Sequence, residues 1–169
     1  FNAFSSLVEK YKDYFPYLPR GSVFNIEGYR FLALGGSAYM DALSTQQGAI
    51  ISDTNIDDCL NLAADSIDII LTHDCPSDIG VSNKAGLEHY GKPGFPRSKE
   101  LEDYFKPKLW LFGHHHHWFK YKNKKTSFFG FSESWNGFGL LDKNFKLTIV
   151  KHTIEKKKSF IDKVLIKLN

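Results

Sequence analysis

Two short apolar runs, each followed closely by a histidine, constrain the fold of this chain more than any other feature. Residues 67–71 (IDIIL) lead to His73, and residues 108–112 (KLWLF) lead to His114. Runs of this length, rich in Ile, Leu and aromatic residues, are typical of buried strands. A helical pattern at residues 99–105 separates them, and strands that alternate with helices form parallel sheets. The sequence therefore predicts an α/β fold in which both histidines follow strand ends at one edge of the sheet.

Sequence patterns in the amino-terminal third of the chain predict a helix, a β-hairpin and a second helix. Apolar residues at helical spacing indicate a helix over residues 4–15. A Glu27-Gly28 junction between residues 22–26 and 29–34 predicts two strands joined by a tight turn. A second helix is expected to run through residue 64, with Asp53 or Thr54 as its N-cap.

The carboxyl-terminal third is expected to hold strands and a final helix. Asn-Gly and Lys-Asn turns separate three apolar segments, which predicts three antiparallel strands over residues 126–131, 138–142 and 146–152. Residues 154–169 carry Lys together with apolar residues at helical spacing, so they predict a Lys-rich amphipathic tail helix.

Bulk composition places the chain among ordinary globular domains. Its 169 residues are 42% hydrophobic, which is enough for one domain with a real core. No apolar run approaches the roughly 18 residues of a membrane span, and the two cysteines give no disulfide framework. We therefore expect a cytoplasmic protein with no membrane partner. The chain begins at Phe1 without a Met, which suggests a fragment.

The four consecutive histidines, residues 114–117, lie inside the chain between apolar segments and so belong to the fold. Neutral imidazole is a good ligand for Zn, Mn, Fe and Ni. If this segment is extended, His114 and His116 point to one side and His115 to the other. The pattern therefore predicts that His114 and His116 converge as metal ligands.

Residues 72–76 (THDCP) and 113–116 (GHHH) resemble two motifs of the calcineurin-like metallophosphoesterases, T-H-x-x-P and G-H-x-H. Residues 19–37 (PRGSVFNIEGYRFLALGGS) are similar to a further family segment. The resemblance implies an α-β-β-α sandwich of the metallophosphoesterase type, present here as its second half with carboxyl-terminal antiparallel strands. Residues 1–153 would then be the carboxyl-terminal portion of such a domain.

The resemblance also implies a site and a reaction. His73 and His114 would share one of two divalent metal ions (Mn, Fe, Zn or Ni), and His116 would bind the other. The family's D-x-H, G-D-x-x-D and G-N-H motifs would lie upstream of Phe1. This chain would thus hold no catalytic residue at a family position and would lack turnover alone. The complete protein would hydrolyse a phosphate ester by in-line attack of a metal-bound hydroxide.

A phosphodiester substrate is expected over a monoester, since residues 72–80 and the following loop look similar to nucleotide- and RNA-directed members, including lariat debranching enzymes. The phosphate-ester substrate could then be a nucleotide or a nucleic acid. Two alternatives stay open. One is a non-catalytic, truncated relative that binds a partner through an uncovered amino-terminal side. The other is a mononuclear structural metal site.

The loop from residue 76 to residue 97 is too long for a simple connector, and such loops are usually functional or mobile. We expect Arg97, Tyr90 and His89 to contact substrate, although an ordinary solvated loop fits equally well. Its other candidate contacts are Asn83, Lys84 and Lys92.

Four residues next to the presumed ligands have two interpretations each. His115 and His117 are expected to be exposed or packed on aromatic neighbours rather than to contact ligands or substrate. Asp74 would either orient a metal ligand or cap the loop. Cys75 could bind Zn as a thiolate, but the family resemblance argues against ligation, so it is expected to be a small packed residue.

Overall fold

The computed structural model describes residues 2–14, 16–39, 48–64, 67–83 and 85–152. The chain divides into two compact units, Phe1–Phe131 and Ser132–Asn169. The predicted tail helix over residues 154–169 lies outside the described residues. None of the described helices has the length and apolar character needed to cross a membrane.

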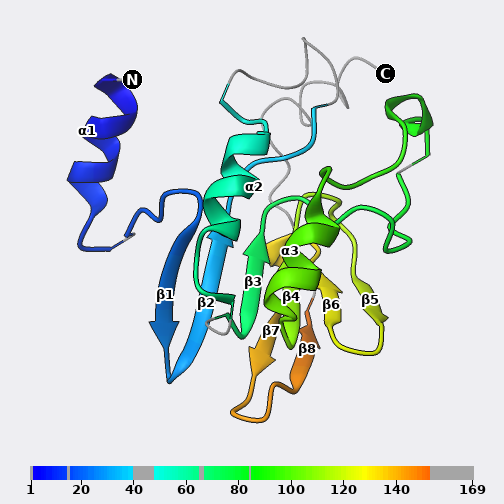
Figure 1. The fold of residues 1–169 in the computed structure, drawn as a ribbon. Helices are drawn as coiled ribbons and strands as arrows, with labels where there is room; N and C mark the ends of the chain where they lie inside the picture. The colour runs from blue at the N-terminus through cyan, green and yellow to red at the C-terminus, as the bar shows by residue number, and fades with distance from the viewer. Residues whose placement is uncertain (1, 15, 40–47, 65–66, 84, 153–169) are drawn as a thin grey trace. The chain divides into compact units, whose positions relative to one another are not determined.

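The first unit is built on one six-stranded mixed sheet (Figure 1). Its strand order is β1-β2-β3-β4-β6-β5, and the four inner strands β2, β3, β4 and β6 run parallel to their neighbours in that order. The two outer strands pair antiparallel, β1 with β2 and β5 with β6. The strand bounds are Ser22–Ile26, Tyr29–Leu34, Ile69–Thr72, Leu109–Phe112, Phe119–Lys122 and Ser127–Gly130 for β1 to β6. The expected α/β class is confirmed.

The β1–β2 hairpin forms where the sequence predicts it. Glu27 and Gly28 join the strands with φ angles of 51° and 84°. Positive φ at both central residues is the requirement of a type I′ turn, whose twist matches that of the flanking strands.

The helices of the first unit are α1 (Asn2–Tyr11), α2 (Asp53–Leu60), α3 (Ser98–Phe105) and the 3₁₀ turn η2 (Glu88–Tyr90). Helices α1 and α2 are shorter than predicted, whereas α3 begins one residue before its predicted start and ends at its predicted residue. The predicted N-cap of α2 is wrong, because the cap is Ser52. The Ser52 hydroxyl accepts the backbone N–H of Asn55, whose side-chain oxygen accepts the backbone N–H of Ser52. This reciprocal capping box satisfies two N–H groups and fixes the start of the helix.

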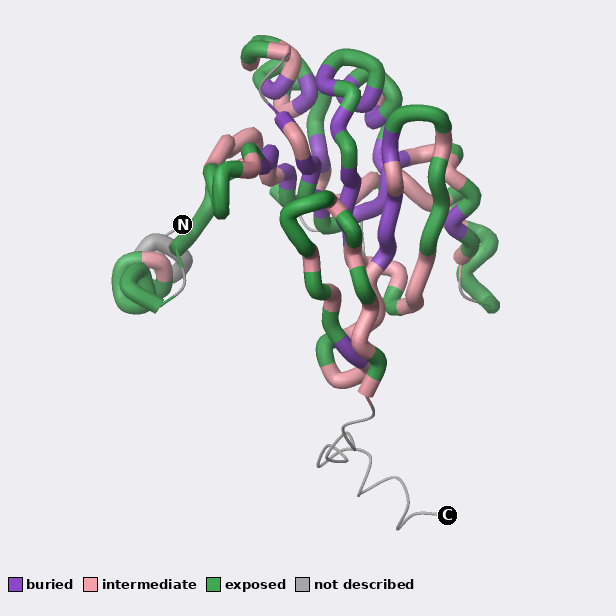
Figure 2. The backbone as a smooth tube through the Cα atoms, turned by 90° about the horizontal axis from the view of Figure 1, so that it is seen from below, coloured by how far each residue is buried: buried purple, intermediate pink, exposed green. Residues whose placement is uncertain are grey.

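One continuous apolar core joins α2 and α3 to a face of the sheet. Alternate residues of the strands point to this face, as the two-residue period of a strand requires. The helices contribute Ile56, Cys59, Leu101 and Phe105, and the strands contribute Leu32, Leu34, Ile70, Trp110, Phe112 and Phe128. In Figure 2 the buried stretches of the tube gather along the strands, whereas exposed stretches dominate the loops.

The prediction of three antiparallel carboxyl-terminal strands is wrong for the first of them. Residues 127–130 form β6, which pairs parallel with β4 inside the main sheet. Its antiparallel partner is β5, a strand that was not predicted because its sequence FKYK has no apolar run; three of its four residues are exposed. The other two strands, β7 (Gly137–Leu141) and β8 (Leu147–Lys151), form the predicted antiparallel pair in the second unit, after the 3₁₀ turn η3 (Ser134–Asn136).

Candidate metal centre

The two histidine loops adjoin because β3 and β4 are neighbouring parallel strands. Leu71 lies opposite Leu111 in the register, so both strands end at the same edge of the sheet. Immediately beyond them the backbone N–H of Gly113 donates to the carbonyl of His73 at 3.0 Å. The sequence-predicted adjacency of the loops is therefore present in the fold.

His73 and His114 direct their rings toward each other. Nε2 of His73 lies 3.0 Å from Nδ1 of His114, and the ring centroids are 4.9 Å apart in an edge-on arrangement. Metal–nitrogen bonds of about 2.1 Å place adjacent nitrogen ligands roughly 3 Å apart. Burial lowers the pKa of His114, which favours the neutral imidazole that binds metals. The two ring nitrogens thus lie within hydrogen-bond distance of each other, a separation that two ligands of one ion also have.

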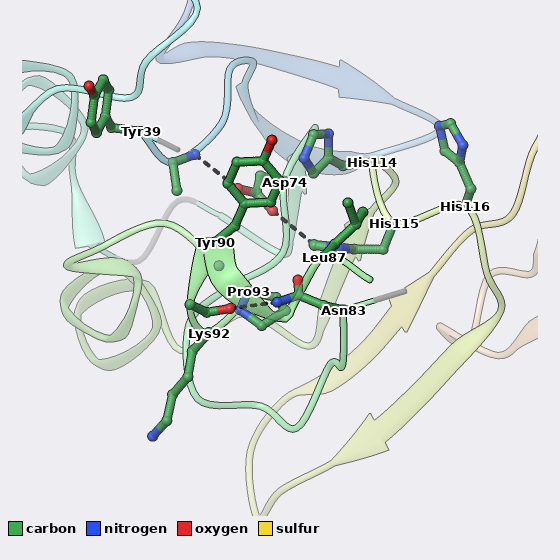
Figure 3. Close-up of a pocket in the computed structure, with 13 residues that line it drawn as sticks. Tyr39, Asp74, Asn83, Leu87, Tyr90, Lys92, Pro93, His114, His115 and His116 are labelled. Carbon is green, nitrogen blue, oxygen red and sulfur yellow. Dashed lines mark hydrogen bonds and ion pairs between the residues drawn. The ribbon is translucent and has the colours of Figure 1, made fainter. Parts of the chain in front are cut away.

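His116 does not accompany His114 as an extended backbone would require. The φ angles are 64° at His114 and 56° at His116, in the left-handed region, and the N–H of His115 turns back to the carbonyl of Gly113 at 2.7 Å. The predicted extended geometry is wrong, because the chain turns as soon as β4 ends. Figure 3 shows the ring of His116 set apart from that of His114, although both residues line the same pocket.

The buried carboxylate of Asp74 makes three hydrogen-bond contacts within the site. It is 2% exposed, and its carboxylate accepts the N–H of Cys75 at 2.7 Å and that of Ala38 at 2.9 Å. Nε2 of His115 lies 3.0 Å from the same carboxylate, with the His115 side chain 13% exposed. Burial raises the pKa of Asp74, but the hydrogen bonds from His115 and Ala38 outweigh it, so the pKa lies below its ordinary value. Asp74 thus contacts the His115 ring and two backbone N–H groups at once.

Asp74, Cys75 and His115 form a second group whose potential ligand atoms all lie within 4.8 Å of one another. The sequence alone does not indicate this combination, although Asp74 and Cys75 directly follow a presumed ligand. The Asp74 oxygens already accept two backbone N–H groups. Burial, followed by the charge of Asp74, raises the pKa of the Cys75 thiol. This donor set suits a metal less well than the pair of imidazoles, because the thiolate form that binds metals is disfavoured.

A pocket of about 330 Å³ opens beside the histidines (Figure 3). His114, His115 and His116 line one side, and the long loop supplies much of the remainder. Figure 3 labels the loop residues of this wall as Asn83, Leu87, Tyr90, Lys92 and Pro93.

Of the two predicted substrate contacts in η2, one lines the pocket and the other does not. Tyr90 lines the pocket, whereas His89 is exposed and packs on the Tyr90 ring at a centroid distance of 4.0 Å. Lys92 also lines the pocket, with its side chain 91% exposed, and Asn83 donates to the carbonyl of Gly91. Lys84 lies outside the described residues.

Arg97 takes part in a junction between α2 and α3. Its guanidinium pairs with Asp53 at 3.4 Å, with Asp57 at 2.8 Å and with Glu100 at 2.8 Å. Arg97 is not among the residues that line the pocket. These contacts account for its position without a ligand.

No model of a known protein family matches the chain, and neither does any curated protein. Among solved structures, the chain is similar to the Thermus thermophilus sulfate thiohydrolase SoxB in complex with glycerol, with a TM-score of 0.43 and 13% identity over 92% of this chain. It is also similar to a putative 5'-nucleotidase from Staphylococcus aureus in complex with alpha-ketoglutarate, with a TM-score of 0.40 and 14% identity over 86% of this chain. The chain spans only 30% and 33% of these two proteins. Similarities of this size assign neither a family nor an activity.

Proposed function

We propose that this chain is part of a metal-dependent hydrolase of phosphate esters. His73 and His114 would hold one divalent metal ion, Mn, Fe, Zn or Ni, and His116 would hold a second. The observation that carries the proposal is the 3.0 Å separation of Nε2 of His73 and Nδ1 of His114 at two adjacent strand ends. The T-H-x-x-P and G-H-x-H patterns at these positions support the same assignment.

Metal ions at such a site would polarise a phosphoryl oxygen and lower the pKa of a bound water. The residues of this chain would supply ligands and one wall of the substrate pocket. Tyr90, which lines that pocket, would contact the ester. Further ligands and the proton donor for the leaving group would come from the complete protein, and this chain alone would have no turnover.

A phosphodiester remains our proposed substrate, with a nucleotide or a nucleic acid as its source. The apolar side of the pocket, which includes Leu87, Tyr90 and Pro93, would accommodate an organic group beside the phosphate. We also propose a cytoplasmic location, because Cys59 and Cys75 both carry free thiols, as is usual in a reducing compartment.

Calorimetric titration of the chain with Zn²⁺ tests the metal site directly. We expect His73→Ala and His114→Ala each to weaken binding by at least about tenfold, since loss of a ligand exceeds the loss of a supporting contact. His89→Ala is the matched control, because His89 is an exposed histidine that does not line the pocket. Equal affinity in all four proteins would overturn the assignment.

Activity is tested in the complete protein. His116→Ala should abolish manganese-stimulated hydrolysis of bis-p-nitrophenyl phosphate while leaving the circular dichroism spectrum unchanged. Retained turnover would contradict the role of His116.

A second candidate function is docking on a partner chain, which exposed apolar side chains near the amino terminus favour. Leu7 is 56% exposed, Tyr11 42% and Tyr17 52%, and together they line a shallow apolar hollow. Leu7→Lys should abolish self-association measured by analytical ultracentrifugation if this surface binds a second copy of the chain. A monomer at all concentrations would exclude that partner.

A further inference from the structure

The loop after β4 holds an unfavourable backbone conformation on both sides of His115. His114 and His116 both have positive φ, at 64° and 56°, and neither is a glycine. For residues with a Cβ the left-handed region costs free energy, so such residues persist only where surrounding contacts hold them. The contacts of His115, which lies between them, therefore help to set the directions of the His114 and His116 rings.

His115 is anchored at its ring and at its backbone. Nε2 lies 3.0 Å from a carboxylate oxygen of Asp74, and the N–H of His115 donates to Gly113. The carbonyl of His115 lies 3.0 Å from Nδ1 of His117. The Asp74 contact spans 41 positions of the sequence, whereas the other two are local.

Asp74 is itself fixed by the segments that follow β2 and β3. Its carboxylate accepts the N–H of Ala38, four residues beyond the end of β2, and the N–H of Cys75 after β3. Because both groups donate, the carboxylate acts as an acceptor, and Nε2 of His115 must be the donor. One buried carboxylate thus ties together the loops that follow three neighbouring parallel strands.

We propose that Asp74 is a positioning residue, which acts through His115 to set the directions of His114 and His116. The inference rests on the proposed function, since those two histidines are the proposed ligands. Asp74 and His115 would bind no metal themselves. Their hydrogen bond would hold the strained loop in the conformation that brings His114 against His73.

Three variants separate this role from general packing. His115→Ala removes the donor to Asp74, whereas His115→Gln retains an N–H at the position of Nε2. His89→Ala is the control, because His89 is an exposed histidine that makes none of these contacts and does not line the pocket. We expect His115→Ala to weaken Zn²⁺ binding about tenfold or more, His115→Gln to recover most of that loss, and His89→Ala to bind as the parent does.

A second readout uses the metal-free chain. Nitrogen-15 shifts of the wild-type ring should show His115 protonated on Nε2, and amide exchange over residues 113–117 should accelerate in His115→Ala but not in His115→Gln. Faster exchange throughout the chain, an Nδ1–H tautomer, or a glutamine variant as impaired as the alanine variant would each overturn the positioning role. If the wild-type chain bound no Zn²⁺, the proposed function would fail, while these metal-free measurements would still decide whether the Asp74–His115 bond holds the loop.

Discussion

The indole N–H of Trp110 donates to the hydroxyl of Thr72 at 3.0 Å, and that hydroxyl donates in turn to the carbonyl of Asp74 at 2.6 Å. Both side chains are buried, Trp110 on β4 and Thr72 at the end of β3. These hydrogen bonds link the interior of β4 to the carboxyl end of β3, beside the candidate metal centre. This relay also shows how the core and the site share contacts, because one end of the relay is an apolar core residue and the other is the backbone beside a proposed ligand.

Thr72→Val should destabilise the fold by about 1–3 kcal/mol, because it leaves the buried indole N–H of Trp110 without an acceptor while keeping the side-chain shape. Urea unfolding followed by tryptophan fluorescence measures the change. Thr54→Val is the control, since Thr54 is an exposed residue of α2 and its replacement should alter stability by less than about 0.5 kcal/mol. Equal stability of the two variants would contradict the importance of the relay.

Arg97→Gln should lower the thermal unfolding midpoint, because it removes ion pairs that join α2 to α3. The hydrogen bond from Arg97 holds the pKa of Glu100 below its ordinary value. A depressed folded-state pKa adds stability above the unfolded pKa, and this contribution is lost as pH falls through the folded value.

The Glu100 part of the Arg97→Gln effect should therefore be present at neutral pH, shrink in acid and be weakened by salt. Calorimetric scans of both proteins, from neutral pH down into acid, measure the difference in unfolding midpoint. If Arg97 contacts substrate instead, the variant would keep its stability and lose affinity for a phosphate ester.

Gly94→Ala should be far more damaging than Gly86→Ala. Both glycines have positive φ, 109° and 87°, so either alanine incurs left-handed strain of about 1–2 kcal/mol. Only at Gly94 would the new Cβ collide, at 2.6 Å from the Ser77 backbone, where the two arms of the long loop meet. Such overpacking adds roughly 1–3 kcal/mol. Denaturant unfolding measures the free energy of unfolding of both variants. An equal loss of stability in the two would show that the chain segments around Ser77 and Gly94 can move apart without destabilising the fold.

Both cysteines should resist thiol reagents while the chain is folded. Burial raises the pKa of Cys59 to about 11, and burial also raises that of Cys75, so at neutral pH the reactive thiolate is scarce and inaccessible. A chromogenic disulfide reagent should detect neither thiol in native buffer and both in strong denaturant. Rapid labelling of one thiol without denaturant would contradict its burial.

Elements with strong local patterns could be predicted from the sequence. The Glu27-Gly28 turn fixed the first hairpin, since the type I′ geometry is encoded by the turn residues themselves. Continuous apolar runs identified β3 and β4, and parallel pairing then placed His73 near His114. That inference needed no side-chain detail, because neighbouring parallel strands end at one edge.

Elements that depend on partners could not be predicted in this way. The strand β5 has exposed lysines at alternate positions and no apolar run, and it exists because β6 supplies its hydrogen bonds. Ser52 rather than a neighbour became the cap of α2 because Asn55 completes the reciprocal pair. Arg97 pairs with three carboxylates on α2 and α3, and these pairs form only because the two helices pack side by side in the folded chain.

The sequence by itself determined that two histidine loops follow adjacent strands, because strand patterns and parallel connections are local rules. Only the tertiary structure decided which rings meet. The directions of His114, His115 and His116 follow from a turn with positive φ at two residues other than glycine, held by a carboxylate 41 positions from His115. Side-chain direction in a loop depends on each φ and ψ, and these are set by distant contacts rather than by residue type.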